Sequence, residues 1–214
     1  NPPGILLVDS GAQYTDGTTD ITRTVAIGTP TATQKEMFTR VLKGHIGVAK
    51  MVFPQGTTGK EVDVPARKAL IEIGKNFGHG TGHGVGCYLS VHEDSAGISP
   101  RSGLPLHAGM ILSNEPGYYE EGEYGIRIES LVITHEREDG ELEFETITLA
   151  PIDKSLIDPS LLDADELDWL NKYHQKVFAT LSPLLDADHQ SWLMQACSPL
   201  QGGQAPKQAA GMKP

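Results

Sequence analysis

The chain has 214 residues, of which 38% are hydrophobic, so it can form one domain with a sizeable core and is too apolar to stay disordered. Its formal net charge of −11 argues against nucleic acid and anionic membrane surfaces as main partners. No apolar run approaches the roughly 20 residues that cross a bilayer, and no signal peptide is visible, so we expect a cytoplasmic protein.

The first predicted unit is a β-hairpin. Residues 4–9 form a short apolar run typical of a buried strand, and the β-branched residues 22–27 predict a second strand. An Asp-Gly pair between them is a turn signal. This hairpin would bring the carboxylates of Asp9 and Asp20 together on neighbouring strands.

Two helices follow in the prediction. Thr33 and Glu36 have capping-box spacing, and apolar residues then recur at helical intervals as far as Val52. A second helix is predicted over 64–74. It places Pro65 in its first turn, where the missing N–H does no harm.

The middle of the chain changes from glycine-rich to strand-like. Residues 78–86 (GHGTGHGVG) contain too much glycine for a helix or a regular strand, so we expect a loop or a distorted edge strand. Residues 110–114 and 126–133 predict strands, with a loop between them. Alternation along the second of these strands places Arg127 and Glu129 on one face.

The last elements complete a mixed fold. Residues 143–149 predict a strand, residues 163–181 an amphipathic helix, and residues 198–214, rich in Gly, Gln, Ala and Pro, a disordered tail. Strands and helices do not alternate regularly along the chain. We therefore predict an α+β fold, with helices on one face of a mostly antiparallel sheet.

Three groups of side chains are suited to catalysis. They are two aspartates in the hairpin, three histidines in and after the glycine-rich segment, and two glutamates in apolar surroundings: Asp9, Asp20, His79, His83, His92, Glu115 and Glu129. Taken singly, most have an ordinary explanation, such as capping a turn or lying exposed in a loop. Glu129 is harder to explain in this way. Burying its carboxylate requires a cationic partner, for which Arg127 is the simplest candidate.

Four carboxylates and one imidazole together form a ligand set for two divalent cations. Four negative charges neutralise two dications, and one carboxylate can bridge two metals about 3.5 Å apart. Oxygen-rich ligation with one histidine favours manganese or cobalt over a thiolate-type zinc site. Two such ions lower the pKa of a shared water and polarise a peptide carbonyl, so the residues predict metal-assisted amide hydrolysis.

Five motifs in this chain resemble those of the pita-bread metallopeptidases, which include methionine aminopeptidase, prolidase and aminopeptidase P. They are DSGAQY with Asp9, TTDITRT with Asp20, GHGTGHGVG with His83, SNEPGYY with Glu115 and GIRIES with Glu129. All five metal-ligand positions of that family are occupied in order. The stretches GHGTGHGVGCYLSVHE and FETITLAPIDKSLIDPSLLDADELDWLNKYH are most similar to the longer, three-domain aminopeptidase P.

The resemblance implies a metal centre and a reaction. Asp9 would chelate one ion, Asp20 and Glu129 would bridge both ions, and His83 with Glu115 would complete the other site. The ions would be two divalent cations, preferably Mn²⁺, with Co²⁺ or Zn²⁺ as alternatives. Their shared hydroxide would attack the carbonyl of an N-terminal residue that precedes proline in a peptide substrate.

The resemblance also implies roles for residues around the metals. Glu115 would accept and shuttle a proton. His79 and His92 would hold the proline ring and the imide carbonyl of the substrate and steady the tetrahedral intermediate. Arg127 would lie beside Glu129 and fix its orientation. The alternative for Arg127, a surface salt bridge, fits its apolar strand less well.

The resemblance further implies a division of the chain. Residues 1–150 would form the metallopeptidase core, residues 151–197 a C-terminal helical extension, and residues 198–214 the tail. The family's catalytic domain starts well before its first metal aspartate, so we expect the fold to be incomplete at the N-terminus and N-terminal domains of the same polypeptide to be missing. This chain alone would then be weakly active or inactive, and a homodimer through the C-terminal region is a further expectation.

Other functions within the same fold provide the alternatives. A prolidase would cut Xaa-Pro dipeptides, and a comparison of dipeptide with longer-peptide kinetics would separate it from an aminopeptidase. A creatinase would cut a non-peptide amide without these metals, and a pita-bread module could bind peptides without catalysis. The complete ligand set disfavours these last two alternatives.

Overall fold

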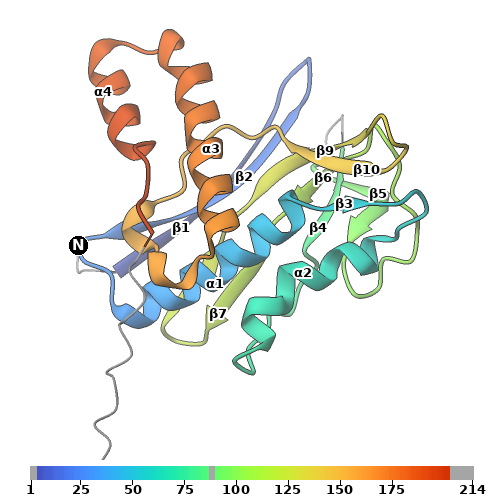
Figure 1. The fold of residues 1–214 in the computed structure, drawn as a ribbon, viewed down its shortest axis with the longest axis horizontal. Coiled ribbons are helices and arrows are strands. Elements are labelled where there is room, and N and C mark those ends of the chain that lie inside the picture. Colours follow the sequence, from blue (N-terminus) through green and yellow to red (C-terminus); the bar gives the residue numbers. More distant parts are fainter. Residues whose placement is uncertain (1–3, 87–89, 203–214) are drawn as a thin grey trace, which may run out of the picture.

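The computed structural model describes residues 4–86 and 90–202, and Figure 1 shows its long helices lying across a layer of strands. The strands are β1 Gly4–Gln13, β2 Thr18–Ile27, β3 Val52–Phe53, β4 Gly82–Val85, β5 His92–Ile98, β6 Ile111–Asn114, β7 Gly117–Glu120, β8 Tyr124–Arg127, β9 Ser130–Glu136 and β10 Leu142–Thr146. The α-helices are α1 Ala32–Ala49, α2 Gly59–Ile71, α3 Ala164–Leu181 and α4 Ala187–Ala196. Short 3₁₀-helices are η1 Lys154–Leu156, η2 Pro159–Leu161 and η3 Ser182–Leu184.

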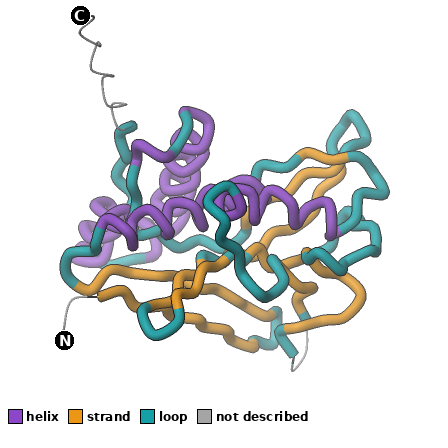
Figure 2. The backbone as a smooth tube through the Cα atoms, turned by 90° about the horizontal axis from the view of Figure 1, so that it is seen from below, coloured by secondary structure: helices purple, strands orange, loops and turns teal. Residues whose placement is uncertain are grey.

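The elements form two layers, with the helices on one side of the strands (Figure 2). The main sheet has the order β3-β10-β9-β6-β4-β5, and each neighbouring pair is antiparallel. The hairpins β1-β2 and β7-β8 form separate small sheets. Leu42 and Ile46 of α1 share one core with Leu112 of β6 and Ile126 of β8. The predicted α+β fold with a mostly antiparallel sheet is therefore confirmed.

The helices carry no membrane span. Within residues 4–86 and 90–202, every helix is too short or too polar to traverse a bilayer. The buried faces of these helices supply the core described above.

Both helices of the first half begin earlier than predicted. The hydroxyl of Thr31 accepts from the Gln34 N–H and the Gln34 side chain accepts from the Thr31 N–H, so the capping box of α1 precedes the predicted one by two residues. The N-cap of α2 is Thr58, which places Pro65 inside the helix instead of in its first turn. Gly47 of α1 faces that ring, and a Cβ there would lie 3.2 Å from the Pro65 Cβ. Packing between the helices thus outweighs the local preference of proline for a helix start.

Residues 78–81 of the glycine-rich segment form the predicted loop, but residues 82–85 form an interior strand, so the prediction of a sheet edge was wrong. β4 pairs with β5 on one side and with β6 on the other, and a bulge falls between His83 and Gly84. A Cβ at Gly82 would lie 1.9 Å from the backbone oxygen of Ser113 on β6. The glycine therefore permits close packing of β4 on β6. In a sequence, glycine required for close packing cannot be told from glycine at a distorted sheet edge.

The other strand predictions need smaller corrections. The strand predicted at 126–133 is broken into β8 and β9, because the N–H groups of Ile128 and Glu129 donate to carbonyls of other segments. The predicted loop before it contains β7, and β5 was not predicted. The strand predicted at 143–149 is β10, which ends three residues earlier.

The C-terminal part is helical, as predicted, and it packs on α1. α3 begins after its N-cap Asp163, and Trp169 on this helix contacts the His45 ring of α1 edge-on, with 6.1 Å between the ring centroids. The following helix α4 was not predicted. Of the tail predicted at 198–214, residues 203–214 lie outside the described residues.

His174 on α3 makes the fold sensitive to acid. Its ring is fully buried, Nε2 accepts from the Ile152 N–H at 3.1 Å, and burial lowers its pKa from 6.5 to about 4. Between these pH values the unfolded chain binds a proton that the folded chain does not, so the free energy of unfolding falls as the pH falls. At roughly 1.4 kcal/mol per pH unit, we expect this residue to remove about 3 kcal/mol of stability.

Urea unfolding at several pH values between these limits measures the effect. His174→Gln keeps an acceptor for Ile152 and does not titrate, so its free energy of unfolding should depend less steeply on pH. The control His189→Gln alters an exposed histidine and should leave the pH dependence as it is in the wild type. Equal slopes in the wild type and His174→Gln would contradict the assignment.

Candidate metal centre

The first hairpin places its two aspartates on one face. In the register of β1 and β2, Asp9 pairs with Thr22 and Gly11 pairs with Asp20. Asp9 and Gly11 are two residues apart and point to the same side, so the two carboxylates are diagonal neighbours. The hairpin therefore places both aspartates on one face, as expected, although only Asp20 belongs to the cluster of three side chains described next.

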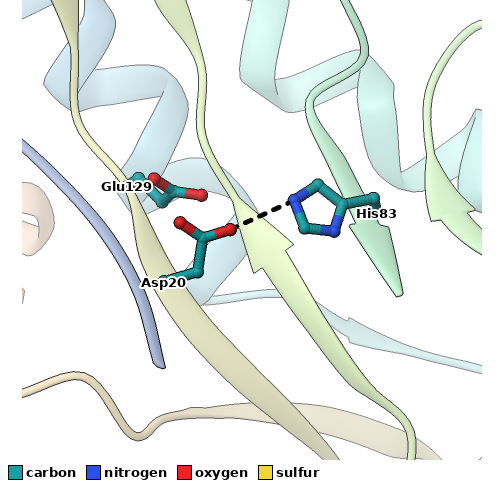
Figure 3. A group of neighbouring side chains, drawn as sticks. All are labelled: Asp20, His83 and Glu129. Carbon is teal, nitrogen blue, oxygen red and sulfur yellow. Dashed lines mark ion pairs between the residues drawn. The ribbon is translucent and has the colours of Figure 1, made fainter. Parts of the chain in front are cut away.

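Three predicted ligands converge from separate parts of the chain. Asp20 on β2, His83 on β4 and Glu129 between β8 and β9 each offer one ligand atom, and these atoms lie within 4.8 Å of one another. Figure 3 shows the three side chains pointing toward a common centre. Nε2 of His83 lies 3.4 Å from Oδ2 of Asp20. Asp20 and Glu129 are buried, at 7% and 2% exposure.

Glu115 joins this group through His83. Its Oε1 lies 3.4 Å from Nε2 of His83 and accepts from the Ser113 hydroxyl at 3.0 Å. The same hydroxyl oxygen accepts from the His83 N–H at 2.9 Å. Ser113, which the sequence analysis did not single out, therefore fixes two predicted ligands relative to each other. Its place on β6, two residues before Glu115, was the available signal.

Asp9 lies apart from the central three. Its side chain is about half exposed, at 48%, and Oδ2 accepts from Nη2 of Arg127 at 2.5 Å. Arg127 in turn donates from Nε to the Thr22 hydroxyl at 3.2 Å, and that hydroxyl donates to Oε2 of Glu129 at 2.7 Å. Arg127 thus contacts Asp9 directly and reaches Glu129 through Thr22. Thr22 follows Asp20 by two residues on one strand, and this spacing could have indicated that its hydroxyl faces the same site.

Burial and the neighbouring charges shift the pKa of Glu129 in the same direction. Burial, together with the neighbouring carboxylates of Glu115, Asp20 and Asp9, raises the pKa of Glu129 from 4.5 to about 7, against the hydrogen bond from Thr22. Burial also raises the pKa of Glu115. The charges of the other three carboxylates thus disfavour ionisation of Glu129, as expected for a group arranged around cations.

His83 has the tautomer that a metal ligand requires. Its Nδ1 lies 2.8 Å from the backbone oxygen of Gly84, which can only accept, so Nδ1 carries the proton and Nε2 faces Asp20 and Glu115. Burial alone would lower the pKa of His83, but its contacts with Asp20, Gly84 and Glu115 outweigh burial and raise it. Acceptors that face one another in this way suit a shared cation, and the donor set fits divalent metal ions.

The other two predicted histidines, His79 and His92, line one cavity together with His83 and Glu115. The cavity has a volume of about 620 Å³, and its lining includes His79, His83, His92, Glu115 and Arg127. The His92 ring packs edge-on against that of His83, with 4.1 Å between the centroids. The cavity therefore places both histidines where a ligand beside Glu115 would meet them.

His79 is held by a residue that the sequence did not indicate. Its Nδ1 donates to the Gly80 backbone oxygen at 2.7 Å, so Nε2 accepts from the Tyr119 hydroxyl at 2.7 Å. Nη1 of Arg127 donates to the same hydroxyl oxygen at 2.9 Å. Burial, then the charges of Arg127 and Arg67, lower the pKa of His79, which keeps it neutral. Tyr119 lay in a predicted loop, so no signal connected it to His79.

A carboxylate-rich centre with one imidazole, set between antiparallel strands, suits a hydrolase that uses divalent metal ions. Residues 1–136 match metallopeptidase family M24, and residues 140–200 match the C-terminal region of peptidase M24. The chain belongs to metallopeptidase family M24. It has the pita-bread fold that the sequence motifs indicated, and it corresponds to only a part of the longer proteins with that fold.

Similar proteins include enzymes of two activities. The chain is 50% identical over 208 residues to a probable Xaa-Pro aminopeptidase P of Laccaria bicolor, covering 92% of this chain and 32% of that protein. It matches the crystal structure of an X-prolyl aminopeptidase from Caenorhabditis elegans, described as a cytosolic enzyme with a di-nuclear active site, with a TM-score of 0.87 and 44% identity, covering 92% of this chain and 33% of the other. For the Xaa-Pro dipeptidase from Bacillus anthracis the TM-score is 0.61 at 36% identity, covering 70% and 40%. The chain spans about a third of the length of the aminopeptidases that it matches.

Proposed function

We propose that this chain is the metal-binding part of an Xaa-Pro aminopeptidase, which hydrolyses the bond between an N-terminal residue and a following proline. The observation that carries the proposal is the convergence of Asp20, His83, Glu115 and Glu129 on a common centre. The match to the nematode aminopeptidase extends over 92% of the chain, against 70% for the dipeptidase, which favours the aminopeptidase over a prolidase.

The proposed cofactor is a pair of divalent cations, with Mn²⁺ preferred for these oxygen ligands and Co²⁺ or Zn²⁺ as alternatives. Asp20 and Glu129 would bridge the two ions, Asp9 would bind one, and His83 with Glu115 the other. When bound, the ions would polarise the peptide carbonyl and lower the pKa of a water molecule that supplies the attacking hydroxide. Asp9 binds Arg127 through Oδ2, which leaves its other oxygen for an ion.

The surrounding residues would position the substrate and move the proton. Glu115 suits proton transfer because its Oε1 is fixed by Ser113 while burial raises its pKa toward neutrality. The two cavity histidines, His79 and His92, would hold the proline ring and the imide carbonyl. The Tyr119 hydroxyl orients the His79 ring, and burial lowers the pKa of His79 and keeps the ring neutral.

The proposed setting is a longer polypeptide. The N-terminal domains that make up the remainder of the aminopeptidases would pack against this chain and narrow its cavity. Leu6 and Val8 of β1 are about half exposed, at 49% and 45%, and would be covered by such a partner. We also propose residence in the cytosol, by analogy with the nematode enzyme, and dimerisation through the helical residues 151–197.

A peptidase assay tests the proposal. The chain is assayed alone and joined to the preceding domains of its polypeptide, on an Xaa-Pro dipeptide and on longer Xaa-Pro peptides. With Mn²⁺ the longer protein should release the first residue of the longer peptides, and EDTA should reduce the rate at least about thousandfold until Mn²⁺ is restored. Cleavage of the dipeptide alone would support a prolidase. A metal-loaded longer protein that binds these peptides without cleaving them would contradict any peptidase function.

A further inference from the structure

Arg23 on β2 links the metal centre to the C-terminal region. Its guanidinium donates to six oxygen atoms, and these are the backbone oxygens of Thr22, Glu129, Ala150 and Pro151 and the hydroxyls of Ser130 and Tyr173. Two of these partners lie at the metal centre and three at or after residue 150. One side chain thus connects segments that are more than a hundred residues apart in sequence.

Arg23 is unusual for a buried charged side chain, because its hydrogen-bond partners are neutral. Among the described residues no carboxylate lies within 4.0 Å of it, whereas the buried Arg67 pairs with Asp63 at 2.6 Å. Desolvation by burial lowers the pKa of Arg23. A guanidinium has five N–H groups in a fixed plane, and here all of them meet neutral acceptors. The arrangement therefore favours precise positioning of those acceptors over charge neutralisation.

The position that Arg23 fixes most tightly is that of Glu129. Glu129 lies in the break between β8 and β9, where no sheet ladder holds its backbone. Nη1 of Arg23 donates to the Glu129 backbone oxygen at 2.5 Å and to that of Thr22 at 3.0 Å. The Glu129 N–H donates to the same Thr22 oxygen, and the Thr22 hydroxyl donates to the Glu129 carboxylate. These contacts fix both the backbone and the carboxylate of Glu129.

The other side of the guanidinium holds the C-terminal region. Nη2 donates to the Ala150 oxygen and to the Tyr173 hydroxyl, each at 2.9 Å, and Nε donates to the Pro151 oxygen. Tyr173 lies on α3, and its hydroxyl also donates to the Ala150 oxygen at 2.8 Å. A displacement of α3 would therefore shift the Arg23 guanidinium, which holds Glu129 in place.

We propose that Arg23 is a positioning residue that makes metal affinity depend on the docking of the C-terminal region. This inference rests on the proposed role of Glu129 as a ligand. Hydrogen-bonded neighbours that orient a metal ligand typically raise the metal affinity by about 10–100-fold. Loss of the Arg23 contacts should weaken Mn²⁺ binding by a factor in that range.

Calorimetric titration of this chain with Mn²⁺ tests the proposal, with circular dichroism to establish that each variant is folded. Arg23→Met should weaken Mn²⁺ binding at least about tenfold, and Arg23→Lys, which keeps the charge and fewer hydrogen bonds, should fall between it and the wild type. Tyr173→Phe removes a contact from the far side of the guanidinium and should also weaken binding. This last variant keeps the test decisive if Arg23→Met does not fold.

The matched control is Arg40→Met. Arg40 of α1 is also a largely buried arginine that donates to a backbone oxygen, that of Ala69 at 2.9 Å, but its partners among the described residues lie neither at Glu129 nor in the C-terminal region. Its Mn²⁺ affinity should stay within about twofold of the wild type. Unchanged affinity in folded Arg23→Met and Tyr173→Phe, or an equal loss in Arg40→Met, would overturn the inference alone. A wild-type chain that bound no Mn²⁺ would overturn the proposed metal centre with it.

Discussion

Glu129→Gln is expected to have opposite effects on the metal-bound and metal-free protein. With Mn²⁺, the amide cannot bridge two cations, so the variant should retain about one ion fewer than the wild type. It should also lose at least about a thousandfold in peptidase rate when joined to the proposed N-terminal domains. Elemental analysis of the dialysed protein and the peptide assay measure these two losses.

Without metal, the same substitution should stabilise the fold above neutral pH. The pKa of Glu129 rises from 4.5 in the unfolded chain to about 7 in the fold. The folded chain then binds the proton more tightly, so the free energy of unfolding is highest below pH 4.5 and falls as the pH rises toward 7. At roughly 1.4 kcal/mol per pH unit, the ionised side chain costs about 3 kcal/mol, which glutamine avoids.

Thermal unfolding in EDTA measures this gain. The Tm of Glu129→Gln should exceed that of the wild type by roughly 5 °C or more above neutral pH, and the difference should shrink as the pH approaches 4.5. Glu136→Gln, at the exposed end of β9, is the control and should change neither metal content nor Tm. A metal-free Glu129→Gln that is less stable than the wild type at high pH would show that the carboxylate is not strained by its neighbours.

The sequence was sufficient for the parts of the site that depend on local pattern. Alternation along 126–133 placed Arg127 and Glu129 on one side, and both do reach the Thr22 hydroxyl although the strand is broken between them. The turn signal of the hairpin likewise predicted the pairing that brings Asp9 and Asp20 to one face. Such features can be predicted from the alternation of side chains along a single strand, which has a period of two residues.

The missed features depend on contacts between distant segments. Alternation on β2 turns Arg23 away from Asp20, and nothing near it in sequence indicates that five of its six acceptors lie beyond residue 128. Pro65 was misplaced in its helix for a related reason, since the space for its ring is provided by Gly47 on another helix. In both cases tertiary packing determines the environment of the residue, and local propensities do not indicate that packing.

Gly82→Ala is expected to disrupt the sheet and the metal centre together. A Cβ at residue 82 would lie 1.9 Å from the Ser113 backbone oxygen and 2.9 Å from its carbonyl carbon, so β4 and β6 would have to separate. Backbone atoms cannot yield as a side chain does, and we expect a loss of at least about 3 kcal/mol in the free energy of unfolding. His83 follows this residue, and its N–H depends on the Ser113 hydroxyl.

The separation of β4 from β6 should therefore move His83 away from Glu115 and weaken Mn²⁺ binding at least about tenfold in any variant that still folds. Gly78→Ala is the matched control, because a Cβ at residue 78 would meet no atom within 4 Å, and we expect its stability to stay within about 0.5 kcal/mol of the wild type. Urea unfolding and Mn²⁺ titration of the two variants measure both effects. If Gly82→Ala matched Gly78→Ala in both measurements, the close packing of β4 on β6 could not be what holds His83 beside Glu115.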